Sequence, residues 1–250
     1  MTLTDQLRQN LRPGRILAVQ VGINRTAVLA ETDLGLTCGI AATIINPGLE
    51  YCRDFAIKSA GMLQSQSVSD LSALVDSDSF PEVSIGLAAI NALLPKNPDQ
   101  WVVLNADEYL IEHGAGKNIV VVGHFPFIPK LRSCAKNLWT LELNPLEDDL
   151  PADMAPEILP SADLVAITAT TLINKTFDGL MALCRPDATV ILVGPSTPLS
   201  PILYDFGIEV LSGTIVVDPQ NTLLSIGQGA TLRQLRQAGY VRLVTMKKGK

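Results

Sequence analysis

The sequence has few of the residues that build disulfide frameworks or zinc sites. Only four cysteines occur in 250 residues, at positions 38, 52, 134 and 184, and no two of them form a CxxC pair. Structural zinc sites and small disulfide-stabilised domains depend on such close spacings. We therefore expect a fold that rests on a hydrophobic core, without a structural zinc ion held by cysteines.

Basic charge and long apolar runs are also scarce. The chain carries 19 Lys and Arg against 25 Asp and Glu, whereas a nucleic-acid-binding domain normally presents a basic face. The one basic cluster, Lys247, Lys248 and Lys250, is interpreted as a solvated end. No apolar run reaches the roughly 18 residues of a membrane span, and residues 1–11 resemble an amphipathic helix more than a signal peptide. We expect a cytoplasmic protein that binds neither nucleic acid nor membrane, with a homo-oligomer left open.

The first part of the chain places predicted strands before predicted helices. An apolar run over 15–31, interrupted by Gly22-Ile23-Asn24, predicts a β-hairpin, and 36–40 predicts a third strand. Helices are predicted over 4–11, 60–66, 68–75 and 84–94. This order is typical of an α+β domain, which we assign to residues 1–95. A connector with Pro and Gly follows at 96–116, and His113 is expected to end a short helix there.

Strands and helices alternate in the second part of the chain. Predicted strands cover 118–122, 138–143, 164–168, 189–193, 209–211 and 214–217, with helices predicted at 127–135, 154–159, 176–184 and 201–206. Runs such as IVVVG and VILVG are apolar at consecutive positions, which is typical of parallel strands covered on both faces. Residues 117–250 are therefore predicted to form a Rossmann-like α/β domain with a parallel sheet.

Small and polar residues follow these strands. They are Gly123 and His124, Glu142 and Asn144, Thr170, Thr171 and Asn174, Pro195, Ser196 and Thr197, and Gly213. Ligands of open parallel sheets bind outside the carboxyl ends of the strands. We therefore predict that these residues converge on one pocket, and that Asn91 or Asp54 of the N-terminal domain completes its wall.

His124 and Glu142 are the candidate catalytic residues, and also the candidate metal ligands. Histidine changes protonation near neutral pH, and Glu142 is expected to orient it or to bind the ligand. Purely structural roles remain open: His124 at the start of a helix, Glu142 and Asn144 capping a turn, and Thr170, Thr171 and Asn174 at a helix N-cap. The acidic residues Asp148, Asp149 and Asp153 are interpreted as a solvated loop with helix-start acids.

Two common motifs are missing from the predicted site. The first strand of the parallel domain is followed by GHFPFIP instead of G-x-G-x-x-G, so NAD is not expected as a cofactor. Ser196 lies outside any G-x-S-x-G elbow, so we do not expect it to be a nucleophile.

Several long motifs resemble one protein family. They are VVVGHFPFIPKLR, ELNP, LPADMAPEILPSADLVAITATTLINKTFDGLMALC, ILVGPSTPLSP and the VLSGTIVVD segment, which together span 117–218. They are similar to a family of uncharacterised bacterial and archaeal proteins described as putative heavy-metal chelation proteins. Asp54-Phe55 and residues 86–92 match that family's companion domain more loosely. The resemblance implies an enolase-N-terminal-like α+β domain, a Rossmann-like domain and a cleft between them.

The residues at the motif positions bear on the metal chemistry that this resemblance implies. Soft heavy metals prefer thiolate and imidazole ligands, but the motifs offer His124 with oxygen groups beside it. The leading prediction is therefore a polar small molecule or a metal complex bound in the interdomain cleft, with catalysis left open. The alternatives are heavy-metal chelation or metal handling without catalysis, and an interaction scaffold with a degenerate Rossmann-like cleft. No cofactor is predicted beyond a metal ion or a metal complex.

Overall fold

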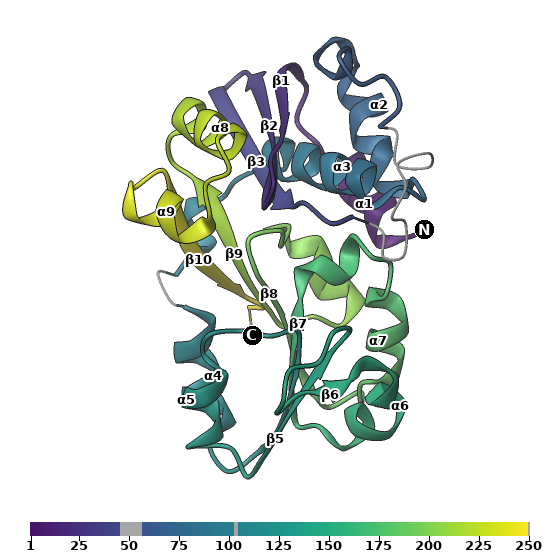
Figure 1. Ribbon diagram of the computed structural model, residues 1–250, viewed down its shortest axis with the longest axis vertical. Coiled ribbons are helices and arrows are strands. Elements are labelled where there is room, and N and C mark those ends of the chain that lie inside the picture. The colour runs from purple at the N-terminus through teal and green to yellow at the C-terminus, as the bar shows by residue number, and fades with distance from the viewer. Residues whose placement is uncertain (46–56, 103–104, 250) are drawn as a thin grey trace.

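The chain folds into two β-sheets with helices packed around them (Figure 1). The computed structural model describes residues 1–45, 57–102 and 105–249. A three-stranded sheet lies at one end of the molecule and a seven-stranded sheet extends toward the other. Within the described ranges, no helix combines the length and the apolar character needed to cross a membrane.

The N-terminal sheet is an antiparallel meander, as the sequence pattern predicted. It contains β1 (Gly14–Val21), β2 (Arg25–Thr32) and β3 (Gly35–Ala42). Helices α1 (Leu3–Gln9), α2 (Val68–Ala73) and α3 (Phe80–Leu93) accompany it. Helix α3 packs directly on β3 at Gly39, where an added Cβ would collide with the backbone of Ala88 and Ala92. Gly39 therefore sets how closely helix and sheet approach each other.

The helix predicted over 60–66 was wrong. Only a 3-10 turn, Leu63–Ser65, forms there. Ser59 and Gly61 have φ angles of 59° and 86°, and this left-handed backbone is incompatible with a continuous right-handed helix.

The seven-stranded sheet confirms the α/β fold class. Its order is β10-β9-β8-β7-β4-β5-β6, and every neighbouring pair is parallel except β9 with β10. The strands are β4 (Asn118–Val122), β5 (Asn137–Glu142), β6 (Leu150–Pro151), β7 (Leu164–Thr168), β8 (Thr189–Val193), β9 (Val210–Val216) and β10 (Val241–Lys247). The chain leaves β4 toward β5 on one side and later returns to place β7 on the other side. The topological switch point, where ligands of doubly wound sheets bind, therefore lies between β4 and β7.

Helices cover both faces of this sheet (Figure 1). One face carries α4 (Ala106–Gly114) and α5 (Ile128–Arg132), and the other carries α6 (Ala155–Ile158) and α7 (Phe177–Leu183). The helix predicted at 201–206 is a 3-10 helix, Pro201–Phe206. The continuous apolar strands are buried because helices lie on both sides of them.

The C-terminal elements differ from the prediction. The two strands predicted at 209–211 and 214–217 are one strand, β9, so Gly213 lies inside a strand and not in a loop. Helices α8 (Pro219–Gly227) and α9 (Leu232–Gln237) and strand β10 follow. Lys247 is exposed, as the prediction of a solvated end implied, but it belongs to β10 and its Nζ lies 4.8 Å from the centre of the Tyr109 ring.

Helix α8 packs on the N-terminal sheet. Ala27, Leu29, Cys38 and Ile40 of that sheet form one buried cluster with Ile226, Leu235 and Val241. Helix α3 covers one face of β1–β3 and α8 covers the other, so this sheet obtains part of its core from the end of the chain. We propose that residues 1–95 and 117–250 are two folding units, with residues 96–116 as the connector between them.

Candidate functional site

A large cavity lies at the carboxyl ends of β4, β7 and β8, at the switch point of the sheet. It has a volume of about 840 Å³. Arg25 of β2 and Ala42 of β3 line it from the N-terminal sheet, and residues of α4, α5 and α9 form other parts of its wall. A neighbouring cavity of about 340 Å³ shares four lining residues with it, namely His124, Phe125, Thr168 and Thr170. We call the two together the cleft.

Most of the predicted site residues line the cleft, divided between its two cavities. The larger cavity is lined by His124, Thr170, Pro195, Ser196 and Gly213, and the smaller one by Gly123, His124, Glu142, Thr170, Thr171 and Asn174. Asn144 is exposed and lines neither cavity. Asp54 lies outside the described residues. The predicted residues therefore divide between two adjoining cavities, whereas the sequence analysis expected them in one pocket.

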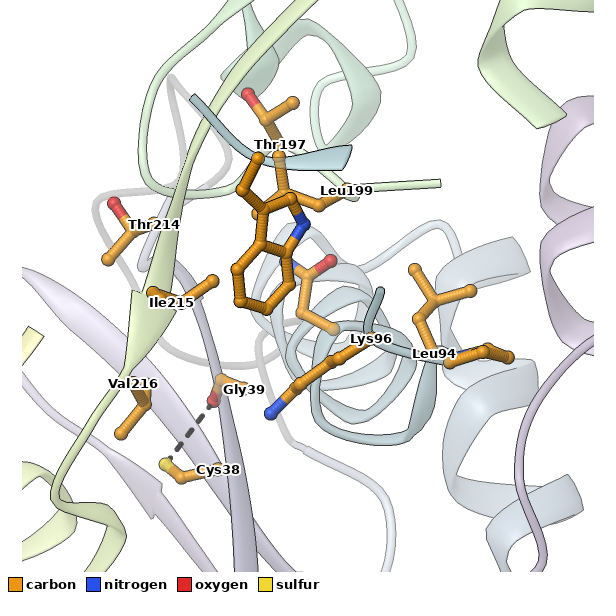
Figure 2. A pocket seen from close by; sticks show the side chains of 12 residues that line it. Cys38, Gly39, Leu94, Lys96, Thr197, Leu199, Thr214, Ile215 and Val216 are labelled. Atoms are coloured by element: carbon orange, nitrogen blue, oxygen red, sulfur yellow. Dashed lines mark hydrogen bonds between the residues drawn. The ribbon is translucent and has the colours of Figure 1, made fainter. Parts of the chain in front are cut away.

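Asn91 and Thr197 line a third cavity, which Figure 2 shows from close by. Its volume of about 20 Å³ has room for about one water molecule, so it is too small for an organic ligand. The Asn91 amide donates hydrogen bonds to the carbonyl oxygens of Ile40, at 3.0 Å, and Ser196, at 3.1 Å. These contacts join the N-terminal sheet to the loop after β8, which gives Asn91 a structural role in place of the predicted wall of the ligand pocket.

Ser196 has a structural contact of its own. Its side-chain Oγ accepts a hydrogen bond of 2.8 Å from the backbone N–H of Ala42, and the residue is only 1% exposed. This bond connects β3 to the rigid loop that contains Pro195 and Pro198. The hydroxyl oxygen therefore satisfies a buried backbone donor at the edge of the cleft.

His124 lies where β4 ends, directly after Gly123. The φ angle of Gly123 is 106°, which residues other than glycine rarely adopt. The imidazole Nδ1 lies 3.0 Å from Oδ2 of Asp149. The Asp149 side chain is only 2% exposed, although the sequence suggested a solvated acid. The residue also accepts a hydrogen bond from the backbone N–H of Leu146. No local sequence signal pointed to this pair, because its members come from different loops.

Glu142 contacts the backbone of His124 and not its ring. Its Oε1 accepts a hydrogen bond of 2.8 Å from the backbone N–H of His124, and its Oε2 accepts one of 2.9 Å from the backbone N–H of Leu143. Glu142 therefore holds the backbone of His124, while Asp149 orients the ring. The reason is geometric, since the neighbouring parallel strands β4 and β5 place Glu142 beside the backbone of residue 124.

The hydroxyl-rich loop after β7 bonds largely within itself. The hydroxyls of Thr168 and Thr170 lie 3.0 Å apart, and Thr171 donates to the Thr168 carbonyl oxygen at 2.7 Å. Asn174 Oδ1 accepts a hydrogen bond of 2.7 Å from the Thr176 hydroxyl. These contacts give Thr171 and Asn174 structural partners, but the N-cap positions are Thr168 for the 3-10 helix Ala169–Leu172 and Thr176 for α7. Thr168 and Thr170 lie on the shared wall of the cleft.

Sequence reasoning missed the charged and aromatic part of the larger cavity. Four cationic side chains line it, from Arg25, Lys130, Arg233 and Arg236, with Asp107 as the carboxylate. Phe125 and Phe127 also line it, and their rings stack with centroids 4.9 Å apart. Arg233 and Arg236 belong to α9, a helix that the sequence pattern did not predict.

The donor atoms near the cleft do not fit direct chelation of a heavy metal. Across the described part of the chain, no group of three or more His, Cys, Asp or Glu side chains is placed to hold a metal ion. Burial raises the pKa of the Cys38 thiol to about 12 and that of Cys184 to about 11. Soft metals prefer thiolate ligands, and neither of these cysteines lines the cleft.

Comparison with known proteins identifies relatives along the whole chain. An uncharacterised protein of Methanocaldococcus jannaschii is 28% identical over 209 residues, which cover 79% of this chain and 77% of the relative. A crystal structure of a protein of unknown function from Desulfitobacterium hafniense is 26% identical, with a TM-score of 0.82 and 98% of each chain covered. A protein of unknown function from Pyrococcus horikoshii shares the fold at 18% identity, with a TM-score of 0.84 and the same coverage of both chains.

Two family models match consecutive parts of the sequence, one over residues 4–94 and the other over residues 105–245. Both carry the description "putative heavy-metal chelation". The second match covers more than half of the chain and includes His124, Asp149 and the arginines of α9. The chain belongs to the putative heavy-metal chelation family.

Proposed function

We propose that the protein binds a polar small molecule or a metal complex in the cleft between its two sheets. The observation that carries this proposal is the position of the larger cavity at the switch point between β4 and β7. A volume of about 840 Å³ falls within the range of roughly 300–1,000 Å³ that small-molecule sites occupy. Residues of both sheets line it, so a ligand there would contact both parts of the chain.

The pair of His124 and Asp149 supplies the reactive group of this site. A buried carboxylate that accepts from Nδ1–H leaves the Nε2 lone pair of a neutral imidazole free. The His124 side chain is 45% exposed and lines both cavities of the cleft. Nε2 is therefore suited to accept a proton from a bound molecule or to coordinate a metal that arrives with ligands of its own.

The family description suggests a ligand that contains a metal, and the residues of the cleft limit how that metal is bound. Direct chelation would need several donor side chains, and the described residues offer the His124 imidazole without a second imidazole or thiolate at the cleft. A metal complex needs fewer protein donors, because its other coordination positions are already filled. The cleft therefore fits a complex better than it fits a bare ion.

Analysis of what the full-length protein releases tests the proposal. Protein purified without chelators would be denatured, and the supernatant analysed by mass spectrometry for small molecules and by elemental analysis for metals. A stoichiometric molecule is expected from the wild type. It should be lost from the cleft-filling variant Thr170→Trp and retained by Thr170→Ser. Equal release by all three folded proteins, or release of none, contradicts the proposal.

A further inference from the structure

We propose that the ligand of the cleft is an organic anion carrying a carboxylate or phosphate group, which Arg25, Arg233 and Arg236 bind. This inference rests on the proposed function and names the class of ligand that the same cleft takes. It follows from the charged groups that line the larger cavity, the partial burial of Arg25, and the aromatic and hydroxyl groups on the rest of the wall.

The cavity is cationic although the chain as a whole has a net charge of −6. Lys130 Nζ lies 3.0 Å from Asp107 Oδ2, so this lysine and the lining carboxylate neutralise each other. None of the ion pairs between described residues involves Arg25, Arg233 or Arg236. Arg25 is half-buried, whereas Arg233 and Arg236 are exposed to solvent. Three guanidinium groups that line one cavity of an acidic protein, without a carboxylate partner among the described residues, favour a negatively charged ligand.

Arg25 provides the strongest local evidence. It begins β2 at the wall of the cavity and is half-buried. Its Nη1 donates a 2.7 Å hydrogen bond to the Asn24 carbonyl oxygen, and its Nε is buried without a hydrogen-bond partner within the described ranges. Burial lowers the pKa of this guanidinium, yet arginine remains charged in proteins. A bound anion would offset the desolvation of that charge.

Helix α9 brings two more guanidinium groups to the same cavity. Arg233 and Arg236 are three positions apart, so they lie on one face of the helix. Figure 1 shows α9 on the same side of the large sheet as α4 and α5, whose residues line the cavity as well. Guanidinium groups bind carboxylate and phosphate oxygens through paired, charge-assisted hydrogen bonds. Arg25 and the two α9 arginines therefore hold a charged group between the two sheets.

The rest of the cavity wall favours an anion that also has an organic part. Phe125 and Phe127 stack at an interplanar angle of 13° and present apolar surface. The hydroxyls of Thr168 and Thr170 and the His124 ring lie on the wall shared with the smaller cavity. A cavity of about 840 Å³ is far larger than an inorganic ion requires. The ligand is therefore an anion with a planar or apolar part.

This assignment changes how the family description applies to the chain. A bare divalent cation would be repelled by the arginines, whereas a metal bound to polycarboxylate or phosphate ligands can carry net negative charge. The geometry thus points to a metal, where one is bound, entering as an anionic complex.

Titration calorimetry on the full-length protein tests the inference, with citrate and pyrophosphate as probes. Both anions should bind, and rising salt should weaken their binding because the site is partly exposed to solvent. Arg25→Gln and Arg233→Gln should each weaken binding by about tenfold, as expected for loss of one charge-assisted contact. Arg242→Gln is the matched control, because this exposed arginine of β10 does not line the cavity.

Three outcomes overturn the inference. They are an absence of citrate and pyrophosphate binding, equal affinity in the Arg233→Gln and Arg242→Gln variants, and tighter binding of nickel(II) chloride than of citrate. The release experiment with Thr170→Trp shows whether only the anion inference is wrong or whether the proposed function is wrong as well. If the wild type releases a neutral or cationic molecule and that variant does not, the cleft binds a ligand but the anion inference is wrong. If neither experiment detects a ligand, both proposals fail.

Discussion

The imidazole Nδ1 of His124 lies 3.0 Å from the buried carboxylate of Asp149, although the two residues follow different strands. Glu142 holds the backbone of His124 at the same time, through the hydrogen bond to its N–H. The ring and the backbone of one residue are thus fixed by two separate carboxylates. This arrangement determines which ring nitrogen is available to a ligand in the cleft.

The tautomer of His124 should depend on Asp149. In the neutral ring of the wild type, we expect the proton on Nδ1, because that nitrogen faces an acceptor. Asp149→Ala should shift the ring toward the Nε2–H form, and ¹⁵N-detected NMR of the imidazole distinguishes the two. Asp148→Ala is the control, since Asp148 is exposed and pairs with Arg132. A tautomer unchanged by Asp149→Ala would show that the carboxylate does not orient the ring.

Ser196→Ala should destabilise the protein. The substitution removes the acceptor of the Ala42 N–H and leaves a buried backbone donor without a partner, which costs about 1–3 kcal/mol of unfolding free energy. Thr197→Val is the matched control, because Thr197 is equally buried but its Oγ1 has no described hydrogen-bond partner. Urea unfolding of both variants measures the difference, and equal midpoints would argue against the role of this contact.

Two glycine substitutions should have opposite effects. Gly39→Ala forces a Cβ against the backbone of α3 and should cost about 1–3 kcal/mol, as overpacking does. Gly179→Ala, inside α7 with open space around the new Cβ, should stabilise the protein by about 0.5–1 kcal/mol through higher helix propensity. Thermal unfolding of both variants provides the test. A neutral Gly39→Ala would mean that α3 can move away from β3.

Cys38 should resist alkylation while the protein is folded. A pKa of about 12 leaves roughly one thiol in ten thousand ionised at about pH 8, and only the thiolate reacts. Peptide mapping after iodoacetamide treatment should find Cys38 unmodified in the native protein and modified in concentrated urea. The thiolate fraction rises with pH, so any native labelling should increase toward alkaline pH. Rapid modification of the folded protein at neutral pH would contradict the burial of Cys38.

The sequence by itself determined the elements that rest on local pattern. The continuous apolar runs of β4, β7 and β8 place each strand at the predicted residues, because strands buried on both faces need apolar side chains at every position. The parallel order then places His124 and Thr170 at one edge of the sheet, as predicted. The hairpin of β1 and β2 was equally predictable from its turn.

Only the tertiary structure decided how the cleft is completed. Asp149 is buried beside His124 because the loop after β5 folds back, and no local periodicity records such a return. Arg25 and Arg233 meet at one cavity because α8 packs on the N-terminal sheet and carries α9 with it. Contacts between residues about 200 positions apart follow from packing of whole elements, whereas sequence pattern reports only on a residue's neighbours along the chain.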